Sequence, residues 1–376
     1  MSDRVQLGSL VKLSTESAKD PAAVGLTRSV GLDHIDSDDL RLRRWSDIGN
    51  GADFTRVFRA GDVLFGKRRS YQRKVALADF DGVCSGDILV VRTADPRLDG
   101  LYLAYLLASP LFIGHAISSS AGSLSPRIRP RDLERFEFDL PSLDEQHRVV
   151  EVMRAVDREI EAAEQVHLCA TTALSSFADR VWTQAKTYVP LGHYAADKTG
   201  QLFDGDWLET KDQSDSGIRI VQLADIGIGV FLDKSARFIT EGTAVRLGCN
   251  LLKGGDLLIS RMADPIGRTC VLPDRLTGSV TAVDVAVLRV ADQSVSDYLS
   301  CVLQAPSWFR ECNKLASGTT RSRISRSRLE AIKVPLKEDD AVAVHFDRLR
   351  TLQSASQTLL DTAMGQRASL LKELIG

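Results

Sequence analysis

The amino-acid sequence predicts an α+β protein in which two α+β units form a pseudo-twofold repeat, separated by two long antiparallel coiled-coil spacer helices. A heptad pattern runs through residues 142–186, and a second helical pattern runs through 339–374. One order of strand-like and helix-like segments also occurs in both halves of the chain. A long amphipathic helix needs a partner to cover its apolar stripe, so we expect the two helices to pair with each other.

The first long helix has the clearer pattern. Ser142 and Glu145 form a capping-box sequence at its start, directly after Pro141. Apolar or small side chains then recur at intervals that mostly alternate between four and three, and His167 falls in the same register. These seam positions are Val149, Met153, Val156, Ile160, Ala163, Ala170, Leu174, Phe177 and Val181.

The second helical pattern is weaker because polar residues and Gly365 interrupt it. Its expected apolar positions are Val342, Leu349, Leu352, Leu359, Ala363 and Leu370, with His345, Ser356 and Gln366 in the same register. Polar seam residues weaken a coiled coil but can set its register. The alternative is that both helices are core elements of one larger α+β domain.

The internal repeat favours the paired helices. Strand-like runs at 30–35, 61–67 and 86–93 are followed by a helix-like run at 101–109, and the same order returns at 219–226, 255–261, 283–290 and 295–305. A shift of 196 residues superimposes Tyr102 on Tyr298 and Pro110 on Pro306. We therefore divide the chain into units at 1–141 and 187–335 and helical segments at 142–186 and 336–376.

Composition and motifs limit the classes of function. The 376 residues include 44% hydrophobic residues, with no signal-peptide pattern and no apolar run of membrane-spanning length. Six scattered cysteines without zinc-site spacing fit reduced thiols in the cytoplasm. We find no nucleotide-binding, cofactor-binding or hydrolase motif and expect no metal site, so we nominate no catalytic residue.

The net charge of −2 conceals a local basic cluster. Residues 56–74 contain seven Lys and Arg residues and one acidic residue, Asp62. Most of the cations fall on an expected loop after a strand, where they suit DNA phosphates and base edges. The candidate DNA-binding residues of this loop are Lys67, Arg68, Arg69, Tyr71, Arg73 and Lys74. The alternative is an ordinary solvated surface loop.

Further candidates lie outside this loop. Trp207 is one of them, although the protein core is the more usual place for a tryptophan. Repeated arginines precede the last strand of each half, where they would contact phosphates or pair with acidic residues such as Glu134 and Glu330. The remaining candidate DNA-binding residues are Arg127, Arg129, Lys211, Arg261, Arg268, Arg321 and Arg323.

Four segments of the chain resemble specificity subunits of type I restriction–modification systems. In the first half they are GDVLFGKRRSYQRKVALADFDGVCSGDILVVR and SLSPRIRPRDLERFEFDLPSLDEQHRVVEVMRAVDREIE, and in the second half they are GDLLISRMADPIGR and SGTTRSRISRSRLEAIKVP. The resemblance covers essentially the whole chain. It implies two target-recognition domains that each read half of a bipartite DNA site. It also implies two modification subunits, which bind S-adenosylmethionine, and a motor–nuclease restriction subunit. The second boundary, VPLKED at 334–339, departs from the LPSLDEQ pattern, which affects whether both helices engage the modification subunit equally.

Two other functions fit the same residues. One is the specificity component of another DNA-modification or phage-defence system. The other is a scaffold that binds only proteins, through its α+β units and its helices. DNA binding that weakens steeply with salt separates the scaffold from both DNA-binding alternatives.

Overall fold

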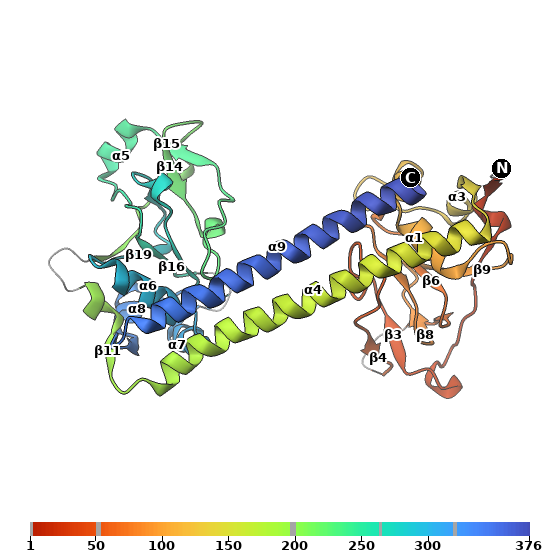
Figure 1. Cartoon of the computed structure of the whole chain (residues 1–376). Coiled ribbons are helices and arrows are strands. Elements are labelled where there is room, and N and C mark those ends of the chain that lie inside the picture. The colour runs from red at the N-terminus through yellow and green to blue at the C-terminus, as the bar shows by residue number, and fades with distance from the viewer. Residues whose placement is uncertain (1–2, 50–53, 196–200, 263–264, 319–321) are drawn as a thin grey trace. The chain divides into compact units, whose positions relative to one another are not determined.

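The structure is a computed structural model of the chain that describes residues 3–49, 54–195, 201–262, 265–318 and 322–376 (Figure 1). The chain forms two compact units. The first consists of residues 1–164 and 359–376, and the second consists of residues 165–358. Both long helices, α4 (Leu143–Gln184) and α9 (Ala341–Ile375), contribute residues to both units.

Helix α4 begins as the sequence predicts. The Glu145 carboxylate accepts hydrogen bonds from the backbone N–H and hydroxyl of Ser142, both at 2.8 Å, and the Glu145 N–H donates to Ser142 Oγ at 3.4 Å. This is the expected capping box. Every predicted seam residue of α4 is buried or half-buried, so the heptad register is confirmed for this helix.

Helix α9 packs against α4 in each unit, and the pairing is antiparallel (Figure 1). In the first unit Arg367 bonds Asp157, and in the second unit Ser356 bonds His167 at 3.0 Å. The predicted apolar register of α9 is wrong at Leu352 and Leu359, which are 61% and 48% exposed. Ser356 and Ala363 of the predicted register are buried, and Phe346, Arg367, Leu371 and Ile375 are buried outside that register.

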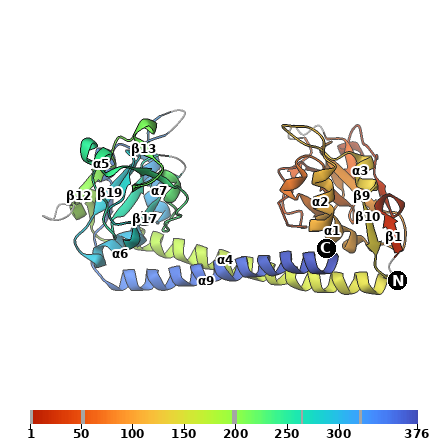
Figure 2. The same cartoon turned by 90° about the horizontal axis from the view of Figure 1, so that it is seen from above.

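The first unit contains two four-stranded sheets, with strand orders β2-β9-β6-β7 and β4-β3-β8-β5. Helices α1 and α2 pack on the first of these sheets, and nearly all of α1 is buried (Figure 2). The β-strands and α-helices of this unit, apart from α4 and α9, are β1 (Asp3–Gln6), β2 (Val11–Leu13), β3 (Arg28–Val30), β4 (Ser46–Asp47), β5 (Arg56–Phe58), β6 (Val63–Gly66), β7 (Val75–Leu77), β8 (Gly82–Cys84), β9 (Ile88–Thr93), α1 (Gly100–Ala108), α2 (Pro110–Ser118), α3 (Pro130–Glu134) and β10 (Glu137–Leu140).

The second unit also contains two four-stranded sheets, with strand orders β12-β19-β16-β17 and β13-β15-β14-β18. Trp308 of α7 is fully buried in its largest core. The β-strands and α-helices are β11 (Tyr188–Pro190), β12 (Gln201–Asp204), β13 (Gln213–Ser214), β14 (Ile218–Val221), β15 (Arg237–Ile239), α5 (Glu241–Leu247), β16 (Leu257–Ser260), β17 (Thr269–Val271), β18 (Val280–Thr281), β19 (Val285–Arg289), α6 (Gln293–Val302), α7 (Pro306–Leu315), α8 (Arg326–Ala331) and β20 (Lys333–Pro335).

The two units share several details of topology. Their first sheets place strands in the same order, and each is followed by two helices separated at a proline, Pro110 or Pro306. A buried carboxylate pairs with an arginine in the same place in each sheet, Asp62 with Arg92 and Asp256 with Arg289. The predicted strand at 30–35 is wrong beyond Val30, because residues 32–34 form a turn.

Among the described residues, no single helix is long and apolar enough to span a membrane. Helices α1 and α2 meet the length and composition criteria only as a pair, which is bent by 59°. Most of the apolar side chains in this pair are buried in the core of the first unit.

Candidate nucleic-acid interface

Two basic segments that are far apart in the sequence lie side by side in the first unit. The N–H of Arg69 donates to the carbonyl of Pro126 at 2.8 Å, and the N–H of Ile128 donates to the carbonyl of Lys67 at 3.0 Å. Arg68 Nε also donates to Ser125 Oγ at 2.6 Å. We call residues 67–74 and 119–129 together the first platform. Its backbone pairing brings the two predicted arginine groups of this unit into one surface.

Asp87 positions two arginines of the first platform. Its carboxylate lies 3.8 Å from Arg68 Nη1 and 3.5 Å from Arg127 Nε. The side chains of Arg68 and Arg127 nevertheless remain 40% and 53% exposed. Their guanidinium groups are therefore oriented by one acid while a large part of each can still contact a ligand.

The predicted DNA-binding residues of the first platform differ in whether their side chains have polar partners within the protein. Lys67, Arg69 and Tyr71 have side chains without a polar partner in the described part of the chain, and Tyr71 is 53% exposed. Arg73 Nη2 donates to the carbonyl of Ala108 at 3.3 Å, and Lys74 Nζ donates to the carbonyl of Leu32 at 2.5 Å. The first three side chains are therefore not occupied by polar contacts within the described residues.

Backbone geometry sets this loop apart from an ordinary solvated loop. Arg69 and Arg73 have φ values of 55° and 53°, which non-glycine residues rarely adopt. They flank the short 3-10 turn Ser70–Gln72. Within the described ranges, Arg69 Nε and Ser70 Oγ are also buried without a hydrogen-bond partner. Such strain and unsatisfied polarity are concentrated at functional sites in proteins.

Arg129 lies at the end of the first platform and pairs locally. Its Nε donates to Asp132 Oδ2 at 2.6 Å, while its side chain is 70% exposed. Pairing with acidic residues, the alternative to phosphate contact considered from the sequence, occurs here with other acids than Glu134: Arg127 pairs with Asp87, and Arg129 pairs with Asp132 of α3.

The second unit repeats the backbone pattern of the first platform. The N–H of Ile324 donates to the carbonyl of Arg261 at 3.0 Å, and the N–H of Arg261 donates to the carbonyl of Asp284 at 2.9 Å. Arg323 Nη2 lies 3.6 Å from Asp284 Oδ1, as Arg127 lies beside Asp87. We call residues 261–262, 265–268, 317–318 and 322–324 the second platform. Arg323 pairs with Asp284 and not with Glu330, the alternative considered from the sequence.

Arg261 is engaged inside the second unit. Its side chain is only 7% exposed and forms an ion pair with Asp204. It also donates to the carbonyls of Ile324 at 3.1 Å and Val283 at 3.2 Å. Burial lowers the pKa of this guanidinium relative to its ordinary value, although Asp204 opposes that shift. Arg261 therefore differs from Lys67, which holds the matching place in the first platform.

The other predicted residues of the second unit are dispersed. Arg268 Nη2 lies 3.5 Å from the carbonyl of Leu223. Trp207 is 70% exposed, so the core position considered from the sequence is wrong. Lys211 Nζ lies 2.6 Å from Glu209 Oε2, and Trp207 Nε1 donates to Glu209 Oε1 at 3.4 Å. Arg321 lies outside the described residues.

Sequence reasoning missed the acids that organise both platforms. Asp87 and Asp284 each lie at the second position of a predicted strand, 86–93 or 283–290. Their equivalent places in the repeat were a usable signal. An acid that recurs beside repeated arginines is a candidate partner for them.

Comparisons with known proteins identify the relatives of this chain. The family model of the type I restriction modification DNA specificity domain matches residues 42–168. This range includes the whole first platform and the first half of α4.

Two curated relatives are specificity subunits. The chain is 28% identical over 118 residues to the type I restriction enzyme EcoDI specificity subunit of Escherichia coli, an alignment that covers 31% of this chain and 25% of that protein. It is 20% identical over 359 residues to the type I restriction enzyme MjaVIII specificity subunit of Methanocaldococcus jannaschii, covering 91% of this chain and 79% of that protein. The first of these alignments thus spans about a quarter of its relative.

Solved structures share the fold over nearly the whole chain. One solved structure concerns complex assembly and conformational transition of the type I R-M system. A chain in that structure aligns with a TM-score of 0.60 and 21% identity, covering 99% of this chain and 97% of that one. The S subunit of the type I restriction–modification system from M. genitalium aligns with a TM-score of 0.55 and 14% identity, covering 100% and 96%. Residues 42–168 thus match the type I restriction modification DNA specificity domain, and the chain is similar over most of its length to a specificity subunit of a type I restriction enzyme.

Proposed function

We propose that this chain is the sequence-specific DNA recognition subunit of a type I restriction–modification complex. Each unit reads one half of a bipartite DNA site through its platform. The observation that carries the proposal is the matched pair of arginines, Arg127 and Arg323, each held by an acid in the same backbone setting. Two recognition surfaces of one design on one chain suit a target with two half-sites.

The chemistry of the first platform suits duplex DNA. Lys67 and Arg69 provide charge for phosphate oxygens, and each phosphate contact releases condensed counterions. Arg68 and Arg127 present oriented guanidinium groups, which can bond both acceptors of a guanine in the major groove. Tyr71 adds an exposed ring beside these cations. Together these groups provide both positioning contacts and base-reading contacts.

The second platform uses a different set of side chains for the same task. Arg323 and Arg268 are its candidate contacts, and Arg321 remains a candidate from the sequence alone. Trp207 and Lys211 are separate candidates on an exposed loop of the second unit, where both contact Glu209. Arg261, by contrast, serves the fold, because its guanidinium is used by Asp204 and two carbonyls.

The domains follow the repeat. Residues 1–141 and 187–335 form two target-recognition domains related by a pseudo-twofold repeat, and the segments 142–186 and 336–376 form antiparallel coiled-coil spacer helices. The spacer helices dock two modification subunits, and a motor–nuclease restriction subunit joins the complex. This docking is supported by exposed apolar side chains on α4 and α9, namely Val152, Val166, Leu168, Val344, Leu352, Leu359 and Met364.

The chain is a non-catalytic subunit in this assignment. Methyl transfer belongs to the modification subunits, which bind S-adenosylmethionine. A specificity component of another DNA-modification or phage-defence system would use the same two platforms, and the identity of the co-purifying subunits separates these two assignments.

Salt-dependent binding to DNA tests the proposal. The full-length chain, with the subunits that co-purify with it, is incubated with a randomised duplex DNA library, and the bound fraction is sequenced. We expect enrichment of one bipartite sequence and an affinity that falls steeply as salt increases, because cationic platforms displace counterions. Failure to retain duplex DNA at low salt, together with stable protein complexes, would establish the protein-binding scaffold instead.

A further inference from the structure

In the first unit, residues 36–44 connect the first platform to helix α4. Ser37 forms an isolated antiparallel bridge with Lys74. The N–H of Asp38 donates to the carbonyl of Arg73 at 3.2 Å, and Arg73 Nε donates back to Asp38 Oδ1 at 2.5 Å. One side of this segment is therefore bonded to the end of the platform loop.

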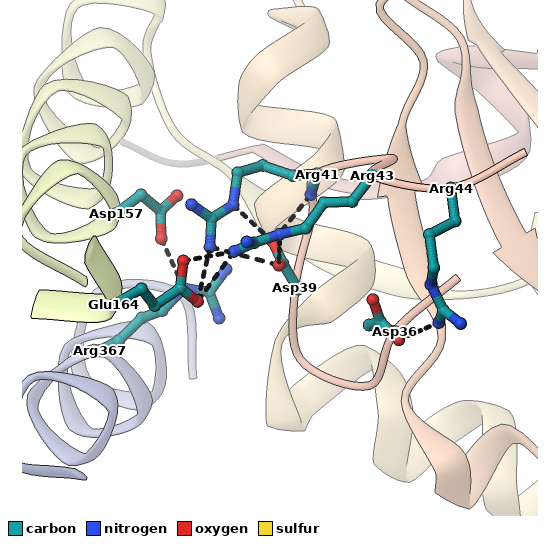
Figure 3. Close-up of polar contacts among 8 residues, drawn as sticks. All are labelled: Asp36, Asp39, Arg41, Arg43, Arg44, Asp157, Glu164 and Arg367. Carbon is teal, nitrogen blue, oxygen red and sulfur yellow. Dashed lines mark hydrogen bonds and ion pairs between the residues drawn. The ribbon is translucent and has the colours of Figure 1, made fainter. Parts of the chain in front are cut away.

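The other side of the segment reaches α4 through charged side chains (Figure 3). Arg43 Nη2 donates to both carboxylate oxygens of Glu164, at 2.8 and 2.7 Å, and Arg41 Nη2 donates to one of them at 3.3 Å. Asp39 accepts from Arg41 Nε at 2.9 Å and from Arg43 Nε at 2.8 Å. We call Asp39, Arg41, Arg43 and Glu164 the ionic cluster.

Hollows flank the ionic cluster. One, of about 590 Å³, is lined by Arg41, Arg43 and Glu164, and another, of about 500 Å³, is also lined by Arg41 and Arg43. Close packing normally fixes one element on another. Between these hollows, the charged side chains make the polar contact of the segment with α4, while a backbone hydrogen bond from Leu77 to Leu40 joins the segment to β7.

Backbone conformation points to a selected role for two side chains, one in the segment and one in the platform loop. Asp38 and Arg73 both have positive φ, at 60° and 53°. Lys74 Nζ bonds the carbonyl of Leu32 in the first unit, as Arg268 Nη2 approaches the carbonyl of Leu223 in the second. These matching contacts agree with a shift of 191 residues from Leu32 to Leu223 and of 194 residues from Lys74 to Arg268.

In that alignment, Asp38 corresponds to Gly229 and Arg73 corresponds to Gly267, and these glycines also have positive φ, at 73° and 90°. Glycine adopts such a conformation without steric cost, whereas other residues do so at a cost. The first unit thus keeps a side chain at two unfavourable positions. Those two side chains form an ion pair with each other.

Neighbouring positions differ between the units in a consistent way. The carbonyl of Ala108 accepts a hydrogen bond from Arg73, and a shift of 196 residues places Gln304 at the matching position. A Cβ atom added to Gly229 would lie 2.2 Å from Gln304 Oε1, so the end of the Gln304 side chain occupies the place that a side chain at residue 229 would take. The ion pair of Asp38 and Arg73 therefore distinguishes the first unit from the second.

The contacts between α4 and α9 also differ between the two units, being charged in the first and neutral in the second. In the first unit Arg367 of α9 donates to Asp157 of α4 at 2.6 Å, and Tyr105 donates to the same carboxylate at 2.7 Å. The matching helix positions in the second unit, again at a shift of 196, hold the neutral pair Thr171 and Gln353, joined at 3.1 Å. Charged contacts thus join loop, helix and core in the first unit.

We propose that Asp38, Asp39 and Glu164 are positioning residues, which hold the first platform at one place on α4 through Arg73 and the ionic cluster. This inference rests on the proposed function of the platform in DNA recognition. Arg73 acts in it through Asp38 and is not itself a base contact. Loss of the cluster then leaves the phosphate-binding cations in place but allows the platform to shift against the bases.

The variants Asp38→Asn and Glu164→Gln test the inference in the full-length chain, with Glu159→Gln as the matched control. Glu159 lies exposed on the same helix and has no polar partner in the part of the chain that the structure describes. Each variant is selected on the randomised duplex library, and amide hydrogen exchange is measured without DNA. Arg127→Ala and Arg323→Ala identify which half-site belongs to which unit.

We expect Asp38→Asn and Glu164→Gln to reduce discrimination within the first unit's half-site roughly three- to tenfold, because partly exposed ion pairs of this kind contribute modestly. The second half-site should keep its sequence. Amides of Asp38 and Arg73 should exchange faster than in Glu159→Gln. The double variant Arg43→Gln with Glu164→Gln should be no worse than the stronger single variant, because both act through one contact.

The outcomes separate the inference from the proposed function. Wild-type chain that enriches no sequence contradicts the proposed function, and the inference fails with it. A second outcome overturns the inference alone. In it the wild-type chain enriches a bipartite sequence, but Glu164→Gln and Glu159→Gln select the same sequences and show the same rates of amide exchange. Equal weakening of both half-sites by Glu164→Gln also overturns it, because that result indicates a general loss of folded protein.

Discussion

Arg127 Nε lies 3.5 Å from Asp87 Oδ1, so an exposed guanidinium on one segment is oriented by an acid on another. Arg323 and Asp284 repeat this relationship at 3.6 Å in the second unit. An arginine that is oriented before it binds loses less conformational entropy on contact with a base. We therefore assign base reading to these two arginines first.

Arg127→Ala is expected to relax one base position in one half-site, and Arg323→Ala is expected to do so in the other. Loss of a bidentate arginine contact costs about 1–3 kcal/mol of discrimination. Asp87→Asn should give a weaker form of the Arg127→Ala result, because it releases the guanidinium without removing it. Sequencing of selected duplexes measures all three. Relaxation of the same half-site by both arginine variants would contradict the assignment of one half-site to each unit.

Lys67→Ala and Arg69→Ala are expected to weaken binding to all sequences alike. Each should lower the slope of log affinity against log salt by about one unit, because each removes one phosphate contact. Lys19→Ala removes an exposed charge outside the platform and serves as the control. An unchanged salt slope in the double variant would place the phosphate contacts elsewhere.

Much of the architecture follows from local sequence. The capping box at Ser142, the seam of α4 and the paired prolines each depend on residues a few positions apart, so pattern alone locates them. The seam of α9 was harder, because its leucines fit more than one helical face. Burial selects Phe346 and Arg367 and leaves Leu352 exposed.

The candidate site was only partly predictable. The basic segments around Arg68 and Arg127 are visible in the sequence, but their pairing rests on isolated bridges, which have no periodic signature. Arg261 has the same character in the sequence as Lys67. Only the structure places Asp204 against it, because the two residues are brought together by separate strands.

Arg261→Ala is expected to destabilise the protein and to have no selective effect on DNA recognition. It leaves Asp204 and two carbonyls without their donor, which costs roughly 2–4 kcal/mol for a largely buried pair. Chemical denaturation measures the loss, with Lys67→Ala as the control that should change stability little. If the Arg261→Ala chain were as stable as wild type but had lost base preference in the half-site read by the second unit, Arg261 would be a DNA contact.

The ionic cluster predicts a pH dependence of stability. Burial tends to raise the pKa of Asp39, but hydrogen bonds from Arg41 and the charges of Arg41 and Arg43 outweigh burial and hold the pKa below its ordinary value. Because the folded-state pKa is the lower one, the stabilisation is fully present above the ordinary pKa of about 4 and is lost as pH falls through the folded-state value.

Asp39→Asn should therefore be less stable than wild type at pH 7, by about 1 kcal/mol for a partly exposed ion pair. The difference should shrink as pH falls below about 4. Denaturation midpoints across this pH range measure both quantities. A difference that stays constant down to pH 2 would show that the carboxylate charge is not the source of the stabilisation.

The helix seam predicts a contrast between two apolar residues. Met153 of α4 is fully buried, so Met153→Ala should cost about 2–5 kcal/mol through lost burial and an unfilled cavity. Leu352 of α9 is 61% exposed, so Leu352→Ala should change the free energy of unfolding by less than about 0.5 kcal/mol. Thermal or chemical denaturation distinguishes them. Equal losses would show that the register of α9 differs from the one described.

The central claim is that two separate platforms on one chain each read one half of a bipartite DNA sequence. Its most direct test is to map methylated sequences in cells that produce the chain with its modification subunits, comparing wild type with Arg127→Ala and Arg323→Ala. We predict one bipartite methylated sequence, with one half relaxed by Arg127→Ala and the other half relaxed by Arg323→Ala. Methylation of a single continuous sequence, or of the unaltered bipartite sequence by both variants, would contradict the claim.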